Sequence, residues 1–165
     1  MKKLTLTFLL TLVAVAAPAQ EIFKLVRDGA ARAVNNPTSG IAVTMIAQFK
    51  LTTLNYIESK ARNFAPTPAA ADSLLDNQAY YLSEFIDLYI DEIVKKMPKD
   101  EKRKRVILFM DASKSNPLFG DTDTELIDSY MKDGDQLTPF CLDTDWERAL
   151  AAAKYGLGEL DKQEE

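Results

Sequence analysis

The chain has 165 residues, with 20 lysine and arginine residues against 25 aspartate and glutamate residues, so its formal net charge is −5 at pH 7. It contains no histidine and one cysteine, Cys141. This composition excludes Ser-His-Asp and Cys-His catalysis, H-E-x-x-H zinc proteases, thiolate zinc sites and an internal disulfide. The acidic balance also disfavours binding to nucleic acid, which carries charge of the same sign.

The N-terminus has the pattern of a secretory signal peptide. Met1 to Lys3 form a short cationic region, Leu4 to Ala17 are uncharged and mostly apolar, and Ala17-Pro18-Ala19 offers small residues for signal peptidase. The apolar run is shorter than the roughly 20 residues that cross a bilayer. We therefore expect residues 1–19 to be removed, and the protein to be exported to the periplasm or cell surface of a Gram-negative bacterium, with no transmembrane segment left in the mature chain.

Two helices are predicted in the first part of the mature chain. Glu21 to Val34 has apolar residues at helical spacing, and Asn35-Asn36-Pro37 ends this pattern. Gly40 to Asn63 is the second predicted helix, with Thr38 or Ser39 as its cap. Because Ile41 to Phe49 is free of charge and apolar on more than one face, we expect this helix to be central in the bundle, although its β-branched residues leave a strand possible for part of it.

The next two helices are separated by Pro98. After the stiff connector Ala65 to Pro68, the segment Ala70 to Met97 carries an apolar stripe at three- and four-residue steps, which predicts a long helix with a buried face. Lys99 to Ser113 is predicted to return antiparallel to it. Val106 to Met110 is a continuous apolar run, for which a helix is favoured and a short strand is the alternative.

Two capping boxes predict short helices near the C-terminus. Thr122 to Glu125 would begin a helix at about Asp123 to Lys132, and Thr144 to Glu147 would begin one at about Asp145 to Tyr155. The predicted fold is therefore all-α, an irregular bundle of about four longer helices and two short C-terminal helices in a single domain over residues 20–158. An α+β fold with a strand at Val106–Met110 is the alternative, and residues 159–165 are predicted to be a disordered charged tail.

A basic cluster between residues 95 and 105 is the first candidate site. As possible anion-binding residues we select Lys99, Lys102, Arg103 and Arg105, which could contact lipid headgroups, acidic glycans or an acidic protein. The competing, local interpretation is that these charges stabilise the helix ends and bind no ligand. Cations at the end of one helix offset its dipole, as do Asp100 and Glu101 at the start of the next helix.

Carboxylates and aromatic residues form the other candidates. The acidic run that starts at Asp121 fails the calcium-loop pattern, because Leu126 stands where a glycine is needed, so helix capping is the preferred interpretation. An acidic face on the third helix is interpreted as solvated, and Cys141 as a small buried hydrophobe. The acidic-face residues are Asp76, Glu84, Asp87 and Asp91; the aromatic residues, interpreted mainly as core, are Tyr56, Tyr80, Tyr81, Tyr89 and Trp146.

These observations favour a non-catalytic interaction module of the bacterial envelope, without cofactor or metal. The loop-rich stretch Asn116 to Asp143 is the predicted contact region, since loops on a rigid scaffold often hold binding residues. The candidate partner-binding residues are Asp121, Asp123, Asp143 and Trp146, and the partner is an unknown protein or small molecule. The alternative function is a carrier of a small apolar ligand or lipid between helices, lined by Ile41–Phe49 and Val106–Met110.

Overall fold

The computed structural model describes residues 20–121 and 140–156, and within these ranges the chain is all-α. Its helices are α1 (Glu21–Asn35), α2 (Ile41–Phe64), α3 (Pro68–Val94), α4 (Lys99–Lys114) and α6 (Trp146–Tyr155). The predicted all-α bundle is confirmed, and Val106–Met110 lies inside α4, so the strand alternative is wrong. The predicted signal peptide, the helix at Asp123–Lys132 and the charged tail fall outside the described residues.

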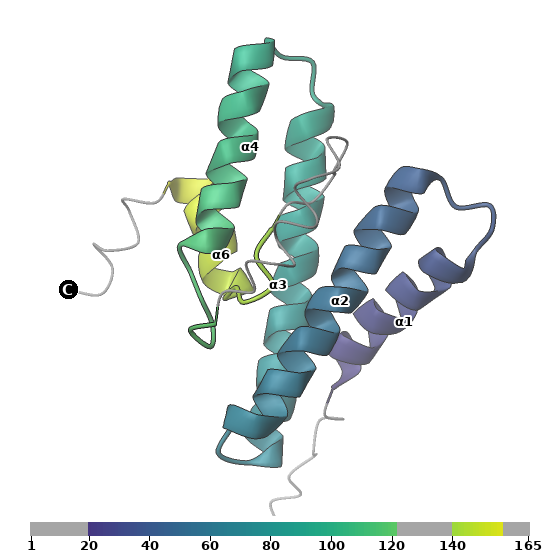
Figure 1. Ribbon diagram of the computed structural model, residues 1–165, viewed down its shortest axis with the longest axis vertical. Coiled ribbons are helices and arrows are strands. Elements are labelled where there is room, and N and C mark those ends of the chain that lie inside the picture. The colour runs from purple at the N-terminus through teal and green to yellow at the C-terminus, as the bar shows by residue number, and fades with distance from the viewer. Residues whose placement is uncertain (1–19, 122–139, 157–165) are drawn as a thin grey trace, which may run out of the picture.

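Helix α3 is the centre of the bundle, because it packs against all four other described helices. Helices α1 and α2 form one antiparallel hairpin against it, while α4 runs back antiparallel to α3 and α6 packs on both of them (Figure 1). Helices α2 and α4 do not pack against each other. None of the described helices is both long and apolar enough to cross a membrane.

The core is built around the predicted apolar stripe of α3. Leu75, Ala79, Leu82, Ile86 and Tyr89 are all buried, as their helical spacing requires. Phe85 lies beside this stripe, and its ring contacts three other aromatic rings edge to face, with centroids 5.1–5.3 Å apart. These three rings come from α4, from the segment that precedes α6, and from α6 itself: Phe109, Phe140 and Trp146.

Helix α2, which was expected to be central because Ile41–Phe49 is free of charge, is not the central helix of the bundle. Its charge-free first half is the more exposed part, with Ile41 81% and Val43 51% exposed. The buried residues begin at Ala47 and continue through the second half of the helix, as far as Ala61. The upper end of α2 diverges from α3 in Figure 1, so the absence of charge there does not mean burial. Contact with α3, rather than local composition, decides which half is buried.

Two of the predicted helix caps are wrong. Neither Thr38 nor Ser39 caps α2, whose N-cap residue is Gly40 without a side-chain bond. At α6 the cap is Asp145, whose carboxylate accepts from the amides of Glu147 and Arg148 at 3.2 and 3.4 Å. Thr144 cannot serve as the cap because its hydroxyl is bonded inside the protein.

One cap that was not predicted begins α3. The connector that precedes this helix contains its N-cap, Thr67, whose hydroxyl oxygen accepts from the amide of Ala70 at 3.1 Å, and Pro68 occupies the first helical position. Helix α3 ends at Val94 instead of Met97. The sequence therefore placed the helix correctly and misplaced its two ends by two or three residues.

Candidate functional site

Two loop segments meet below the C-terminal end of α4, and we call them together the loop junction: residues 115–121 and 140–145. The side-chain amide of Asn116 donates to the carbonyl of Ala112 at 2.7 Å, which holds the chain as it leaves α4. The backbone carbonyl of Asn116 accepts from the amide of Asp145 at 2.7 Å. These bonds attach the loop after α4 to the first turn of α6.

Buried hydroxyl groups complete this attachment. The hydroxyl oxygen of Ser113 accepts from the amide of Cys141 at 2.8 Å, and the Thr144 hydroxyl donates to the carbonyl of Cys141 at 2.8 Å. The two hydroxyl oxygens lie 3.1 Å apart, and both side chains are fully buried. Because a buried polar group without a partner is costly, this small network fixes the loop junction in one arrangement.

Cys141 is buried within the loop junction, as its apolar neighbours predicted. Burial raises the pKa of the Cys141 thiol above its ordinary value of 9.0, which a backbone hydrogen bond with Asp143 opposes only in part. The thiol therefore stays protonated at neutral pH, and a protonated, buried thiol is a poor nucleophile.

Two of the predicted partner-binding residues, Asp143 and Trp146, are buried in the same region. Asp143 is 1% exposed, and its Oδ1 accepts from the amide of Phe119 at 2.8 Å. Trp146 is fully buried, with its ring 6.2 Å from that of Phe49. Among the described residues, neither Asp143 Oδ2 nor Trp146 Nε1 has a hydrogen-bond partner. Both side chains therefore support the loops from inside and present no surface to a partner.

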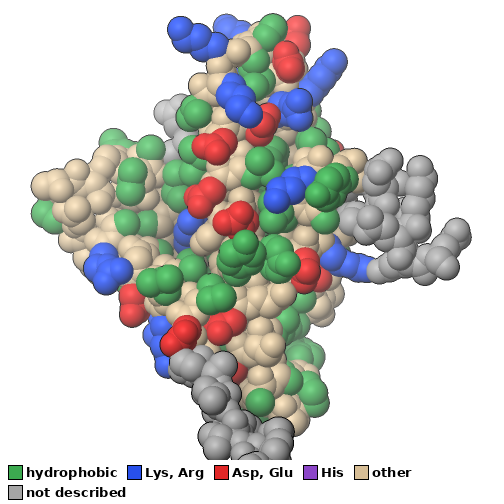
Figure 2. All heavy atoms as spheres, turned by 180° about the vertical axis from the view of Figure 1, so that it is seen from behind, with side chains coloured by type: hydrophobic (Ala, Val, Ile, Leu, Met, Phe, Trp, Pro, Cys, Tyr) green, Lys and Arg blue, Asp and Glu red, His purple; other side chains and the backbone are tan. Residues whose placement is uncertain are grey.

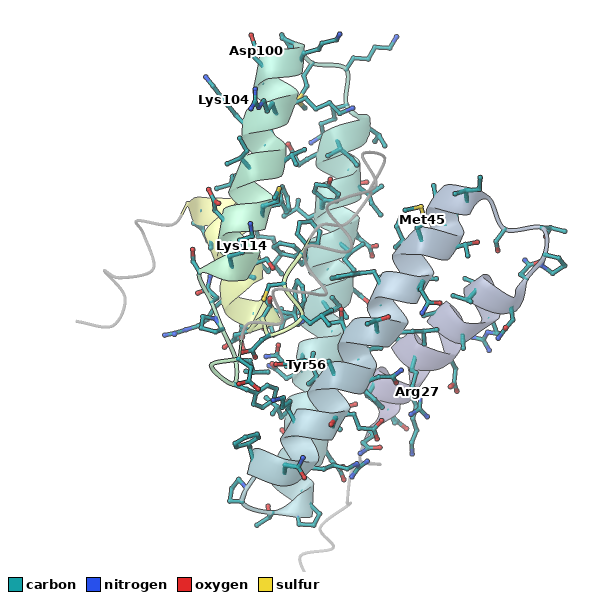
Figure 3. The ribbon with its side chains drawn as sticks, viewed as in Figure 1. Arg27, Met45, Tyr56, Asp100, Lys104 and Lys114 are labelled. Carbon is teal, nitrogen blue, oxygen red and sulfur yellow. The ribbon has the colours of Figure 1, made fainter. Side chains whose placement is uncertain are left out.

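A group of side chains beside the loop junction does reach the surface, and we call it the aromatic patch. Tyr56 lies on the face of α2 that is turned toward the loop after α4 (Figure 3), and its ring is 6.4 Å from the ring of Phe119. Phe64, at the end of α2, is 66% exposed, with its ring 5.9 Å from the Phe119 ring. The patch consists of Tyr56, Lys60, Phe64, Phe119 and Asp121.

Charged groups close over these rings. Lys60 Nζ lies 5.6 Å from the ring centroid of Tyr56 and 5.9 Å from that of Phe64, within the range of cation–π attraction. The same ammonium group is paired with Asp121. Gly120 has φ of 80°, a conformation that favours glycine, and this turn directs the chain so that Asp121 reaches Lys60. Asp123 lies outside the described residues.

The predicted anion-binding residues lie at the other end of the α3–α4 hairpin, and we call residues 94–105 the basic tip. Figure 3 shows Asp100 and Lys104 at the end of α4 that is remote from Lys114. Lys99, Lys102, Arg103 and Arg105 are all exposed. Glu92 is 2.5 Å from Lys95 and 3.8 Å from Arg105, and these are the ion pairs of the tip within the described residues. The hydrogen bond from Lys95 lowers the pKa of Glu92.

One residue on the acidic face of α3 makes a hydrogen bond that stabilises the fold, and other residues on this face are solvated. Asp76 Oδ1 accepts from the amide of Phe23 at 2.8 Å, so a carboxylate of α3 satisfies the N-terminal turn of α1. Asp87 lies 3.7 Å from Lys50 of α2 but is exposed, as are Glu84 and Asp91. In the described part of the chain, no three acidic, cysteine or histidine residues are grouped as a metal ion would need.

The aromatic residues divide between core and surface. Tyr89 is buried as predicted, and burial raises the pKa of its hydroxyl. Tyr80 is 47% exposed, so the core interpretation fails for it. Tyr81 is half-buried, and a hydrogen bond to Glu147 raises its pKa.

Lys60, Phe64 and Phe119 were missed in the sequence. Tyr56, Lys60 and Phe64 follow one another at four-residue steps on α2, and this spacing was the signal that could have grouped them. Phe119 gave no comparable signal, because its contact with Tyr56 depends on how the loop after α4 folds back. No family model, curated protein or solved structure matches this chain.

Proposed function

We propose that this protein is an exported, non-catalytic interaction module of the bacterial envelope, and that the aromatic patch is its contact surface for a protein partner. The observation that carries the proposal is the exposure of Phe64, which is 66% exposed although it stacks against Phe119. A large aromatic side chain held in place at the surface, with charged groups beside it, resembles the hot spots of protein interfaces.

The loop junction supports this proposal because it limits the freedom of the patch. Phe119 is held through its amide by buried Asp143, and Asp121 is held by Lys60. A surface that is already ordered loses little conformational entropy on binding, so more of the contact energy appears as affinity.

The experiment measures affinity for a partner recovered from the cell envelope and then purified. We expect Phe64→Ala to weaken binding at least tenfold, because truncation of a hot-spot aromatic costs more than about 1–2 kcal/mol. Tyr80→Ala is the matched control, since Tyr80 is an exposed aromatic residue on α3 whose ring packs on Tyr81 and not on a residue of the patch. Equal affinities for wild type and Phe64→Ala would refute the patch as the contact surface.

Export is tested separately by fractionation and mass measurement. Processed protein in the periplasmic or surface fraction, with Gln20 as its first residue, is the expected result. Protein that stays in the cytoplasm with residues 1–19 attached would overturn this part of the proposal without bearing on the patch.

No described contact favours the alternative function as a carrier of a small apolar ligand. Its two lining segments, Ile41–Phe49 and Val106–Met110, lie on α2 and α4, which do not pack against each other. Ile41 and Val43 are also exposed to solvent.

A further inference from the structure

The basic tip concentrates positive charge in an acidic protein. The eleven residues Lys95 to Arg105 hold seven lysine and arginine residues and two carboxylates, a net charge of +5 in a chain whose total is −5. All seven cationic side chains are exposed. Figure 2 shows several blue side chains at the upper end of the molecule, with red ones among them and along the body below.

Helix electrostatics account for only part of this charge. Because α4 begins at Lys99, five of the seven cations lie in its first two turns, where the helix dipole disfavours positive charge. Lys99 and Arg103 are four residues apart, a spacing at which like charges repel. Asp100 and Glu101 offset this only in part, since they are two carboxylates among five cations. The local interpretation drawn from the sequence therefore holds for Asp100 and Glu101 and for Lys95 and Lys96 at the end of α3, but not for the five cations of α4.

Apolar side chains lie among these cations. Val94, the last residue of α3, is 70% exposed, and Ile107 on α4 is 45% exposed. Between the two helices the turn contains Met97 and the exposed Pro98. Figure 1 shows the tip as a projecting end of a helical hairpin. Exposed apolar side chains lie near its turn, and exposed cationic side chains flank them in the sequence.

We propose that the basic tip docks this protein peripherally on an anionic phospholipid surface. The cations would contact headgroup phosphates, while Val94 and the turn reach the boundary of the acyl chains. Each lysine or arginine near such a surface contributes about 1 kcal/mol, which corresponds to roughly a fivefold change in partitioning. The rest of the molecule is acidic, so the same surface repels it and the protein approaches with the tip first. The aromatic patch, near the other end of the α3–α4 hairpin, then faces away from the lipid.

The first experiment measures co-sedimentation of the full chain with vesicles. Vesicles that contain phosphatidylglycerol are compared with vesicles of phosphatidylcholine alone, and binding is expected only to the former. The triple variant Lys99→Gln/Lys102→Gln/Arg103→Gln should lower partitioning roughly a hundredfold, from three fivefold steps. Raising the ionic strength from about 0.1 M to about 1 M should release the wild type, because the Debye length falls from about 10 Å to about 3 Å.

A second triple variant provides the matched control. Lys24→Gln/Arg32→Gln/Lys154→Gln removes the same charge from exposed positions outside the tip. We expect it to bind within about threefold of wild type, since these cations lie more than a Debye length from the surface in a tip-first orientation. Any affinity of residues 1–19 for lipid is common to all variants and does not enter the comparison. Equal losses in the two triple variants would overturn the proposal, because binding would then depend only on net charge.

A fluorescent reporter distinguishes lipid from an acidic protein as the partner. Trp146 is the single tryptophan of the chain and is buried, so Val94→Trp adds one responsive indole at the tip. Its emission should shift to shorter wavelength with anionic vesicles and stay unchanged with soluble poly-glutamate. A shift with poly-glutamate and none with vesicles would assign the tip to an acidic protein and overturn docking on lipid.

Discussion

The loop junction and the basic tip lie at opposite ends of the α3–α4 hairpin and use their polar side chains in opposite ways. At the loop junction, Ser113, Asp143 and Thr144 are buried and bind backbone groups. At the basic tip, Lys99 and Arg103 are exposed and make no ion pair with any described residue. The comparison teaches that the use of a polar residue depends on its burial. Burial decides whether it holds the fold together or remains available to a partner.

The largest effect should come from truncating an aromatic residue that anchors the loop junction. Phe140 is fully buried, with its ring 5.0–6.0 Å from those of Phe49, Phe85 and Tyr89. Phe140→Ala should lower the free energy of unfolding by about 3–5 kcal/mol, because it leaves a cavity in the core. Phe64→Ala, at an exposed position, should cost less than about 1 kcal/mol in the same urea titration. Similar losses in both variants would contradict the division between core and patch.

A smaller loss should follow from removing a buried hydroxyl group. Ser113→Ala leaves the buried amide of Cys141 without its acceptor, at a cost of about 1–3 kcal/mol in unfolding free energy. Ser115→Ala, two residues away and exposed, is the control and should change stability by less than about 0.5 kcal/mol. If thermal unfolding showed both variants to be as stable as wild type, the buried network would not be what fixes the loops.

At the basic tip, the ion pairs of Glu92 should contribute less and should depend on pH. The hydrogen bond from Lys95 lowers the pKa of Glu92 from its ordinary value of 4.5. Its contribution is therefore present at neutral pH and lost as the pH falls through the lowered native pKa. Glu92→Gln should cost less than about 1 kcal/mol at pH 7 and nothing in strong acid. Glu84→Gln, at an exposed position on the same helix, is the control and should change stability at pH 7 by less than about 0.5 kcal/mol in parallel urea titrations.

The smallest predicted effect is a gain in stability, whereas the changes above all lower it. Lys99→Gln/Arg103→Gln removes two like charges from the first turns of α4 and should stabilise the protein by a few tenths of a kcal/mol. At low salt this should appear as a small rise in Tm, which disappears as salt screens the repulsion. A fall in Tm would mean that these cations support the fold, and the contrast with the loop junction would then be lost.

Most helix positions could be predicted from the sequence, because the signals are local. The prolines at 37, 66 and 98 mark the breaks, and apolar residues at three- and four-residue steps mark the stripe of α3. Helix ends were less predictable, since several residues could serve as a cap. Thr144 and Asp145 both fit the start of α6, and only the buried bonds of the Thr144 hydroxyl leave the cap to Asp145.

The candidate site was less predictable than the fold. Of the predicted partner-binding residues, Asp121 is exposed, but Asp143 and Trp146 proved to be buried. Their burial depends on residues of α2 and α4 that are distant in the chain, so no local pattern could reveal it. Phe64 was also missed, because a single phenylalanine at the end of a helix is equally consistent with a core position and a surface position.

The sequence by itself determined the all-α class, the order of the described helices and the concentration of positive charge between Lys95 and Arg105. These properties depend on neighbours within one or two helical turns, and such contacts follow from spacing alone. Only the tertiary structure decided that α3 is the central helix, which half of α2 is buried, and which polar side chains remain exposed. Burial depends on how segments far apart in the chain pack together, and that packing is a property of the whole fold.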